Sequence, residues 1–339
     1  KKATFIRHFK RAFSLQFKIF LTFSALIAAV MMLTAFIINS ITRSSAIETA
    51  RENSKREIAL ITNNLDSRLS HVEDYAISVA INSDVIATLE EYPDPPENNR
   101  VKNEVKDTLN NAVSTIIGLN RNIYLWDITS STGEFFRSGV GNISKVQEAL
   151  PAGFFASLPK SLAVQINGPF LVKNYSFLTQ NKAAPTPMFI VTKRVVDLNT
   201  RSPRGYVFFA VQEESFSSIF EDNMPLSENT NYYILDENNR IVSSSQKSDI
   251  LQPVSDVLQL SDGNLSRLFS KKSLIVNKNG IQTVYSMSET LSETVNWKVI
   301  SENSLEPLLQ EQNNTSRMIM LIGGAAMLLA FLFAFFLSG

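Results

Sequence analysis

The side chains that most often carry out catalysis are scarce in this sequence. It has no cysteine and two histidines, His8 and His71, so a thiol nucleophile and a cysteine-ligated metal are excluded. Around His71, the charged residues Asp66, Glu73 and Asp74 are typical of the solvated face of a helix. The sequence has no Gly-rich phosphate loop, no metal-binding pair of histidines and no nucleophile elbow. We therefore predict no catalytic residue, no metal site and no cofactor in this segment.

Two long uncharged runs, 19–42 and 318–339, are each long enough to cross a hydrocarbon core of about 30 Å as a helix. Six Lys and Arg residues precede the first run, whereas all 32 acidic residues lie between the two. The positive-inside rule therefore predicts a multi-pass plasma-membrane protein with both termini cytoplasmic and residues 43–317 extracellular. A cleaved signal peptide is the rival interpretation, but its apolar core is about 7–15 residues long and this run is longer.

The first 92 residues contain neither glycine nor proline, which predicts one helix running through the first span into a water-exposed stalk. Along this stalk, apolar residues recur every three or four positions and form one stripe. The stripe consists of Ile58, Ile61, Leu65, Leu69, Val72, Ala76 and Val79. Pro93 is expected to end the stalk, and a second helix at 101–117 to end near Gly118.

After Gly118 the spacing of apolar residues becomes that of β-strands, in two successive units with the same opening. Strands of the first unit are expected at 122–128, 134–138, 169–175, 188–196 and 205–211, the last two as an antiparallel hairpin. A short helix or an irregular crossing is expected at 146–158, and a connector at 216–231. Strands of the second are expected at 232–236, 240–245, 273–277, 280–288 and 296–301, with a helical segment at 254–269. The resulting fold class is α+β.

Four stretches give this layout a resemblance to a known family. They are ITNNLDSRLSHVEDYAISVAINSDV (61–85), RGYVFFAVQEESFSSIF (204–220), NYYILDENNRIVSSS (231–245) and VNWKVISENSLEPLL (295–309). The chain resembles the double-Cache extracytoplasmic sensor domain, most closely the input half of YesM-type sensor histidine kinases of Gram-positive bacteria. The resemblance implies two PAS-like antiparallel-sheet modules between two transmembrane helices.

The expected domain organisation combines this resemblance with the two spans. It consists of a cytoplasmic basic leader (1–18), a transmembrane helix (19–42), the stalk and second helix (43–119), a membrane-distal Cache module (120–222), a membrane-proximal Cache module (223–301), a connecting helix (302–317) and a second transmembrane helix (318–339).

The resemblance also implies that the membrane-distal module holds the ligand, between its sheet and the loops over it. Binding pockets are mainly apolar, with a few polar groups that fix the ligand's orientation. Residues of suitable type on the expected sheet are Tyr124, Trp126, Asp127, Arg137, Lys173, Tyr175, Lys193, Arg194 and Asp197. The alternative for each is core packing or a solvated strand end. An arginine two residues before a Trp-Tyr pair, expected for direct amino-acid binding, is missing. A sugar, an amino acid, a peptide or a docked solute-binding protein therefore stay open as partners.

The output implied by the resemblance is a histidine kinase part following residue 339. That part would bind ATP and Mg²⁺ and act on a cytoplasmic response regulator, while this segment has no nucleic-acid partner. A homodimer is expected, and small residues that allow close helix packing in lipid recur in both spans. They are Ala25, Ala29, Ala326, Ala330 and Ala334. The alternatives are a membrane-anchored adaptor for a transporter, the sensor half of a chemoreceptor, and that of a membrane-tethered AraC-type transcription regulator.

Overall fold

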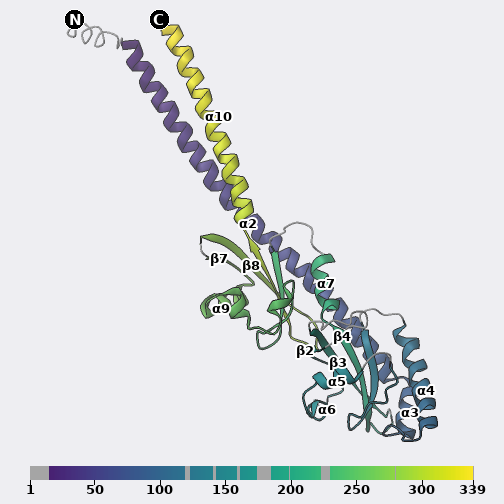
Figure 1. Cartoon of the computed structure of the whole chain (residues 1–339). Helices are drawn as coiled ribbons and strands as arrows, with labels where there is room; N and C mark the ends of the chain where they lie inside the picture. Colours follow the sequence, from purple (N-terminus) through teal and green to yellow (C-terminus); the bar gives the residue numbers. More distant parts are fainter. Residues whose placement is uncertain are drawn as a thin grey trace. The chain divides into compact units, whose positions relative to one another are not determined.

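The computed structural model describes residues 15–118, 123–139, 143–158, 161–173, 185–197, 199–222, 230–278 and 280–338. It confirms an α+β chain in which a long N-terminal helix precedes two antiparallel sheets (Figure 1). The chain divides into two compact units. One contains Ser54–Leu274 and Tyr285–Asn303; the other contains the described parts of Lys1–Asn53 and Ser304–Gly339, together with Ile275–Val284.

Helix α2 (Leu15–Ala80) carries the predicted apolar stripe. All seven stripe residues are buried, and none is more than 2% exposed. They share one core with residues of both sheets, among them Phe209 of the first and Val299 of the second. The prediction of a stalk with one apolar face is therefore confirmed.

The prediction of an uninterrupted helix as far as residue 92 is wrong. Helix α2 ends at Ala80, and a separate helix, α3 (Ser83–Glu91), follows. Asn82 has an extended backbone, and its Oδ1 accepts the N–H groups of Asp84 at 2.9 Å and Val85 at 3.1 Å. This asparagine satisfies donors that a new helix leaves free, so a chain without glycine or proline is still divided here. Helix α4 (Asn99–Ile117) ends before Gly118, whose φ is 58°, as expected.

The first sheet has four strands, in the order β1 (Ile123–Ser130), β4 (Pro203–Gln212), β3 (Thr186–Val196), β2 (Gln165–Val172). All neighbouring pairs are antiparallel, and β3 and β4 form the predicted hairpin. Side chains alternate between the two faces of this sheet. One face packs on α2, and the other is covered by α5 (Ile143–Ala149) and α6 (Phe154–Ser157) (Figure 1).

Two expectations for this sheet are corrected. The segment 134–138 is a loop with one isolated bridge, between Thr129 and Phe135, rather than a strand. Backbone pairing with β1 is short: the Ser130 N–H donates to the Glu134 carbonyl at 2.8 Å and the Phe136 N–H to the Ile128 carbonyl at 3.0 Å. Side chains of β1 add the other contacts, since Asp127 accepts the N–H of Ser138 and the Ser130 hydroxyl accepts that of Glu134. The expected connector begins with helix α7 (Glu214–Asp222), which buries apolar residues at helical spacing. These are Phe216, Ile219 and Phe220.

The second sheet has five strands, in the order β6 (Ile241–Ser244), β5 (Thr230–Leu235), β9 (Lys298–Ser304), β8 (Ile281–Glu289), β7 (Ser273–Lys278). Strands β5 and β6 form the predicted antiparallel pair. A 3₁₀ turn, η1 (Lys247–Asp249), follows β6. The expected helix at 254–269 is divided into α8 (Val254–Leu258) and α9 (Asp262–Lys271), because Gln259 adopts a left-handed conformation and Ser261 caps α9.

Two carboxylates expected on the solvated face of the stalk instead bind the loop before β9. Asp66 accepts the N–H of Leu291 at 3.0 Å, and Glu73 accepts the hydroxyl of Ser292 at 3.0 Å. Apolar periodicity identifies the buried stripe of a helix but not the polar residues beside it that hydrogen-bond a distant loop.

In the other unit, α10 (Glu306–Ser338) is helical through the predicted second span. Among the described residues, one helix is long and apolar enough to cross a membrane, namely α2 from Ala25 onward. Its apolar side chains point outward, with Phe36 71% exposed. Ser316 of α10 donates to Asn39 of α2 at 2.7 Å, and the two helices run side by side there (Figure 1).

Small-residue packing in the spans stays a prediction. Ala25, Ala29 and Ala326 are exposed in the single chain, and the side chains of Ala330 and Ala334 lie outside those described.

The break between α2 and α3 makes a direct prediction. Asn82→Ala removes the side chain that caps α3 and should lower the free energy of unfolding by about 1 kcal/mol. Urea denaturation followed by circular dichroism measures the change. Asn103→Ala, at an exposed position inside α4, is the control and should leave stability unchanged or slightly higher. An Asn82→Ala protein as stable as wild type would show that the cap does not hold this helix.

Candidate ligand-binding face

The face of the four-stranded sheet beneath α5 and α6, here named the α5/α6 face, is an apolar surface with its own cluster of buried residues. Its strand residues are Leu125, Val172, Met188, Ile190, Tyr206, Phe208 and Ala210, and its cover includes Phe135, Ile143, Val146, Phe154 and Leu158. In β4, Tyr206, Phe208 and Ala210 of this cluster alternate with Val207, Phe209 and Val211, which belong to the core on α2. The strand period of two thus gives the sheet two separate apolar faces.

Aromatic rings form much of this cover. Phe155 of α6 packs edge-on against Phe135, with ring centroids 5.7 Å apart, and Phe135 packs on Phe208 at 5.2 Å. Phe155 also lies 5.8 Å from the ring of Tyr206. Gly133 has φ +93°, and a Cβ there would lie 2.8 Å from Phe155. The loop after β1 therefore needs glycine beneath this ring.

Polar side chains cross one end of the same face in register. Residues paired directly across an antiparallel sheet lie on one face, so the pairing identifies them. The two rows are Asp127–Phe208–Thr192 and Thr129–Tyr206–Arg194, each running from β1 through β4 to β3. The α5/α6 face is thus apolar at its centre and polar toward this end.

Uncharged polar atoms on this face, among the described residues, have no hydrogen-bond partner: Thr129 Oγ1, Thr192 Oγ1 and Asn167 Nδ2. Thr129 is 0% and Thr192 1% exposed, while Asn167 pairs with Ile190 and so shares the face. A buried hydroxyl without a partner costs about 1–3 kcal/mol. Small-molecule sites combine mainly apolar walls with a few polar groups, and this face carries both.

The cation of this face is Arg194, which is half-buried with its guanidinium carbon 5.8 Å from the centre of the Tyr206 ring. Tyr124 packs against the same cluster, and burial raises the pKa of its hydroxyl. With Asp127, these are the sequence-predicted residues that the structure places on the α5/α6 face.

Asp127 anchors the loop that closes the polar end of the face. It is 1% exposed, and its Oδ1 accepts the N–H of Ile128 at 2.8 Å and both the N–H and the hydroxyl of Ser138 at 3.0 Å. Burial raises the pKa of Asp127 to about 6, although these hydrogen bonds to the carboxylate oppose the rise.

The other predicted residues lie away from the face. Trp126 packs in the core on α2. Lys193 points to the same side as Trp126, its ammonium donates to a loop carbonyl, and burial lowers its pKa. Arg137 and Lys173 are exposed, and Tyr175 lies outside the described residues.

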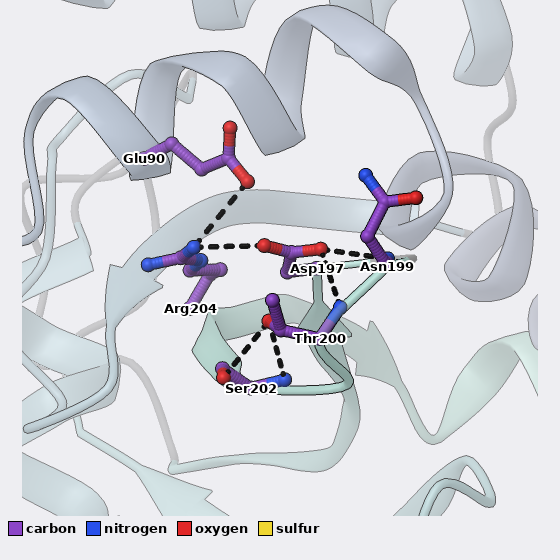
Figure 2. Close-up of polar contacts among 6 residues, drawn as sticks. All are labelled: Glu90, Asp197, Asn199, Thr200, Ser202 and Arg204. Atoms are coloured by element: carbon purple, nitrogen blue, oxygen red, sulfur yellow. Dashed lines mark hydrogen bonds and ion pairs between the residues drawn. The ribbon is translucent and has the colours of Figure 1, made fainter.

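Asp197 belongs to a hydrogen-bonded network in the turn between β3 and β4 (Figure 2). It accepts the N–H groups of Asn199 at 2.7 Å and Thr200 at 3.0 Å, and Arg204 Nη2 at 2.9 Å. Arg204 also reaches Glu90 of α3 at 3.4 Å. The Thr200 N–H, followed by the Arg204 guanidinium, holds the pKa of Asp197 well below its usual range. These contacts tie the hairpin to α3 and occupy the Asp197 carboxylate.

The sequence interpretation did not select Thr129, Thr192 and Asn167. It selected aromatic and charged side chains, whereas these three are short and uncharged. The alternation in β1 and β3 was available as a signal, because Thr129 stands two residues after Asp127 and Thr192 two before Arg194. In the described part of the chain, no group of three or more His, Cys, Asp or Glu side chains could hold a metal ion.

The raised pKa of Asp127 predicts a pH dependence. The folded-state value of about 6 exceeds the reference of 3.8, so the folded protein binds this proton more tightly than the unfolded chain. Protonated Asp127 therefore adds to the free energy of unfolding. This contribution is complete below about pH 4 and is lost as pH rises through 6, a change of about 3 kcal/mol. Asp127→Asn keeps a hydrogen-bond acceptor without the charge. Its free energy of unfolding, measured by urea titration, should therefore increase relative to that of wild type as pH rises from 4.5 to 8. Asp107→Asn, at an exposed site, is the control. If the free energies of unfolding of Asp127→Asn and wild type differed by the same amount at every pH, the raised pKa of Asp127 would be contradicted.

No family model matches the sequence, and the search of curated proteins finds no match. Similarity is found among solved structures. The ligand-binding domain of Pseudomonas fluorescens chemoreceptor CtaA, in complex with L-isoleucine, aligns with a TM-score of 0.54 at 11% identity, covering 80% of this chain and 98% of that one. The extracellular domain of the histidine kinase vpHK1S-Z8 (described as putative) aligns with 0.54 at 12%, covering 79% and 96%.

A domain of a sensory box/GGDEF family protein (also described as putative) from Vibrio parahaemolyticus aligns with a TM-score of 0.54 at 12% identity, covering 77% of this chain and 98% of that one. At such identities the likeness concerns the fold. The chain has the fold of the double-Cache ligand-binding domains found in chemoreceptors and sensor kinases.

Proposed function

We propose that this chain is the input half of a transmembrane receptor, and that its α5/α6 face binds an extracellular small molecule. The observation that carries the proposal is the pair of buried, unpartnered hydroxyls, Thr129 Oγ1 and Thr192 Oγ1, on the aromatic face of a sensor fold. A ligand that supplies the missing hydrogen bonds removes their cost, which is about 1–3 kcal/mol each. Binding would therefore gain from hydroxyls that the protein's own groups leave without a partner.

The ligand of this proposal is a small organic molecule with polar groups at one end and an apolar part. The polar end faces the hydroxyls, the Asn167 amide and Arg194, and the apolar part faces Phe155 and Phe208. An amino acid, a sugar or a small peptide fits this description, and the neighbour CtaA was solved with L-isoleucine and with L-serine. A solute-binding protein that docks on the same module is the other partner in this proposal.

The output we propose is control of a YesM-type histidine kinase in a homodimer of a Gram-positive bacterium. Residues 318–339, at the end of α10, would form a second membrane span, and the kinase part would use ATP and Mg²⁺ to act on a response regulator. The helices α2 and α10, joined by the Asn39–Ser316 contact, would carry movement across the membrane. Coupling of this type needs a ligand that binds the two states with different affinity, typically by about 1–3 kcal/mol.

Thr192→Val tests the ligand face with a two-part signature. Without ligand the variant should be as stable as wild type or more so, because it removes a buried hydroxyl that has no partner. With ligand, it should lose about 1–3 kcal/mol of binding free energy. Thermal shift of the full chain in detergent, against a panel of amino acids and monosaccharides, measures both. Thr283→Val, a buried threonine on β8, is the matched control. A compound that stabilises Thr192→Val as much as wild type would contradict the site.

The membrane topology can be tested with single cysteines, because the chain contains none of its own. Leu291 is 84% exposed, so Leu291→Cys should react with a membrane-impermeant maleimide in intact cells. Lys10→Cys, in the basic leader, should react only after the membrane is permeabilised. The reverse pattern, or labelled protein released into the medium, would contradict an anchored receptor with an extracellular sensor.

A further inference from the structure

Glu213 is a buried carboxylate at the junction of the two sheets. It directly follows β4, the strand that carries Tyr206 and Phe208 on the α5/α6 face, and it is 2% exposed. Its backbone N–H donates to the Pro187 carbonyl of β3 at 3.0 Å, and its own carbonyl accepts the N–H of Ser217 at 3.0 Å. The backbone of Glu213 is therefore fixed to the first sheet and to the start of α7.

The side chain of Glu213 binds the second sheet. Its Oε1 accepts the hydroxyl of Ser243 in β6, and its Oε2 pairs with the ammonium of Lys247 in η1 at 2.6 Å. Lys247 also reaches the hydroxyl of Ser217 in α7 at 2.5 Å. All these residues belong to one compact unit. A single residue thus joins the end of β4 to β6 and to the turn that follows β6.

The same junction contains an apolar contact of a different kind. Trp297, next to β9, packs on Phe189 of β3 and Phe216 of α7, with ring centroids 5.2 Å and 5.6 Å apart. Apolar contact is non-directional and tolerates small sliding movements. A buried carboxylate with two specific partners does not, because moving away from either leaves a charge without compensation in a desolvated site. Both sheets also share the core on α2, but the ion pair is the contact between them with fixed geometry.

We propose that the Glu213–Lys247–Ser243 cluster is the latch through which a change on the α5/α6 face moves the second sheet. This inference rests on the proposed function for its signal, since the ligand would act on β4. The latch itself does not require a ligand. With the cluster intact, we expect the two sheets to unfold locally as one cooperative unit, and without it we expect them to unfold separately.

Two matched cysteine variants of the full chain in lipid nanodiscs test the latch. Val195→Cys places a thiol in β3 of the first sheet and Val242→Cys places one in β6 of the second, at positions 0% and 1% exposed in a chain without other cysteines. The rate of thiol labelling reports how often each sheet opens. With Glu213 present, both thiols should label at the same rate over a range of urea concentrations. With Glu213→Gln, the two rates should differ by about tenfold.

The controls separate coupling from general stability. Lys247→Arg keeps the ion pair, and Glu214→Gln removes the exposed neighbouring carboxylate; both should leave the two rates equal. Where Glu213→Gln does not fold, Lys247→Gln, altering a side chain 52% exposed, should separate the rates in the same way. Unequal rates in the wild-type background, or rates that rise together when the pair is removed, would overturn the latch. Because no ligand is used, failure of the ligand site leaves this result unaffected.

Discussion

The structure depends on burying one face of α2. Its stripe from Ile58 to Val79 is a single row of apolar side chains, yet it packs on residues of both sheets. Burying an aliphatic side chain of this size stabilises a fold by about 1.5–3 kcal/mol. Buried residues of both sheets form one core with this helix, so the stalk is part of the shared core of the compact unit. Because the same helix continues from this core through the apolar segment that begins at Ala25, a movement of the helix would disturb both sheets.

Much of the architecture could be predicted because it rests on local periodicity. The stripe on α2, the end of α4 at Gly118 and the hairpin of β3 and β4 follow from spacing and turn residues alone. Two of the failures share a cause. The break at Asn82 and the loop at 134–138 depend on which backbone groups a side chain binds, and such bonds leave no periodic trace.

The candidate site was predicted less well than the fold, for a physical reason. Residue type suggested Trp126 and Lys193, but neighbouring side chains of a strand point to opposite faces, so both lie on the other face from Asp127 and Arg194. Asp197 has the charge of a ligand-binding residue but is occupied by its own turn (Figure 2). What distinguishes Thr192 is the absence of a partner, which only the packed structure reveals.

The alternation along β4 has a consequence for how proteins with this fold can diversify. Tyr206, Phe208 and Ala210 face the α5/α6 side, while Val207 and Phe209 hold the sheet to α2. Substitutions at the first set change the α5/α6 face, while the second set preserves the packing on α2. Under the function proposed above, copies of one ancestral gene could therefore acquire different ligands by changing every other codon of a strand, without rebuilding the scaffold.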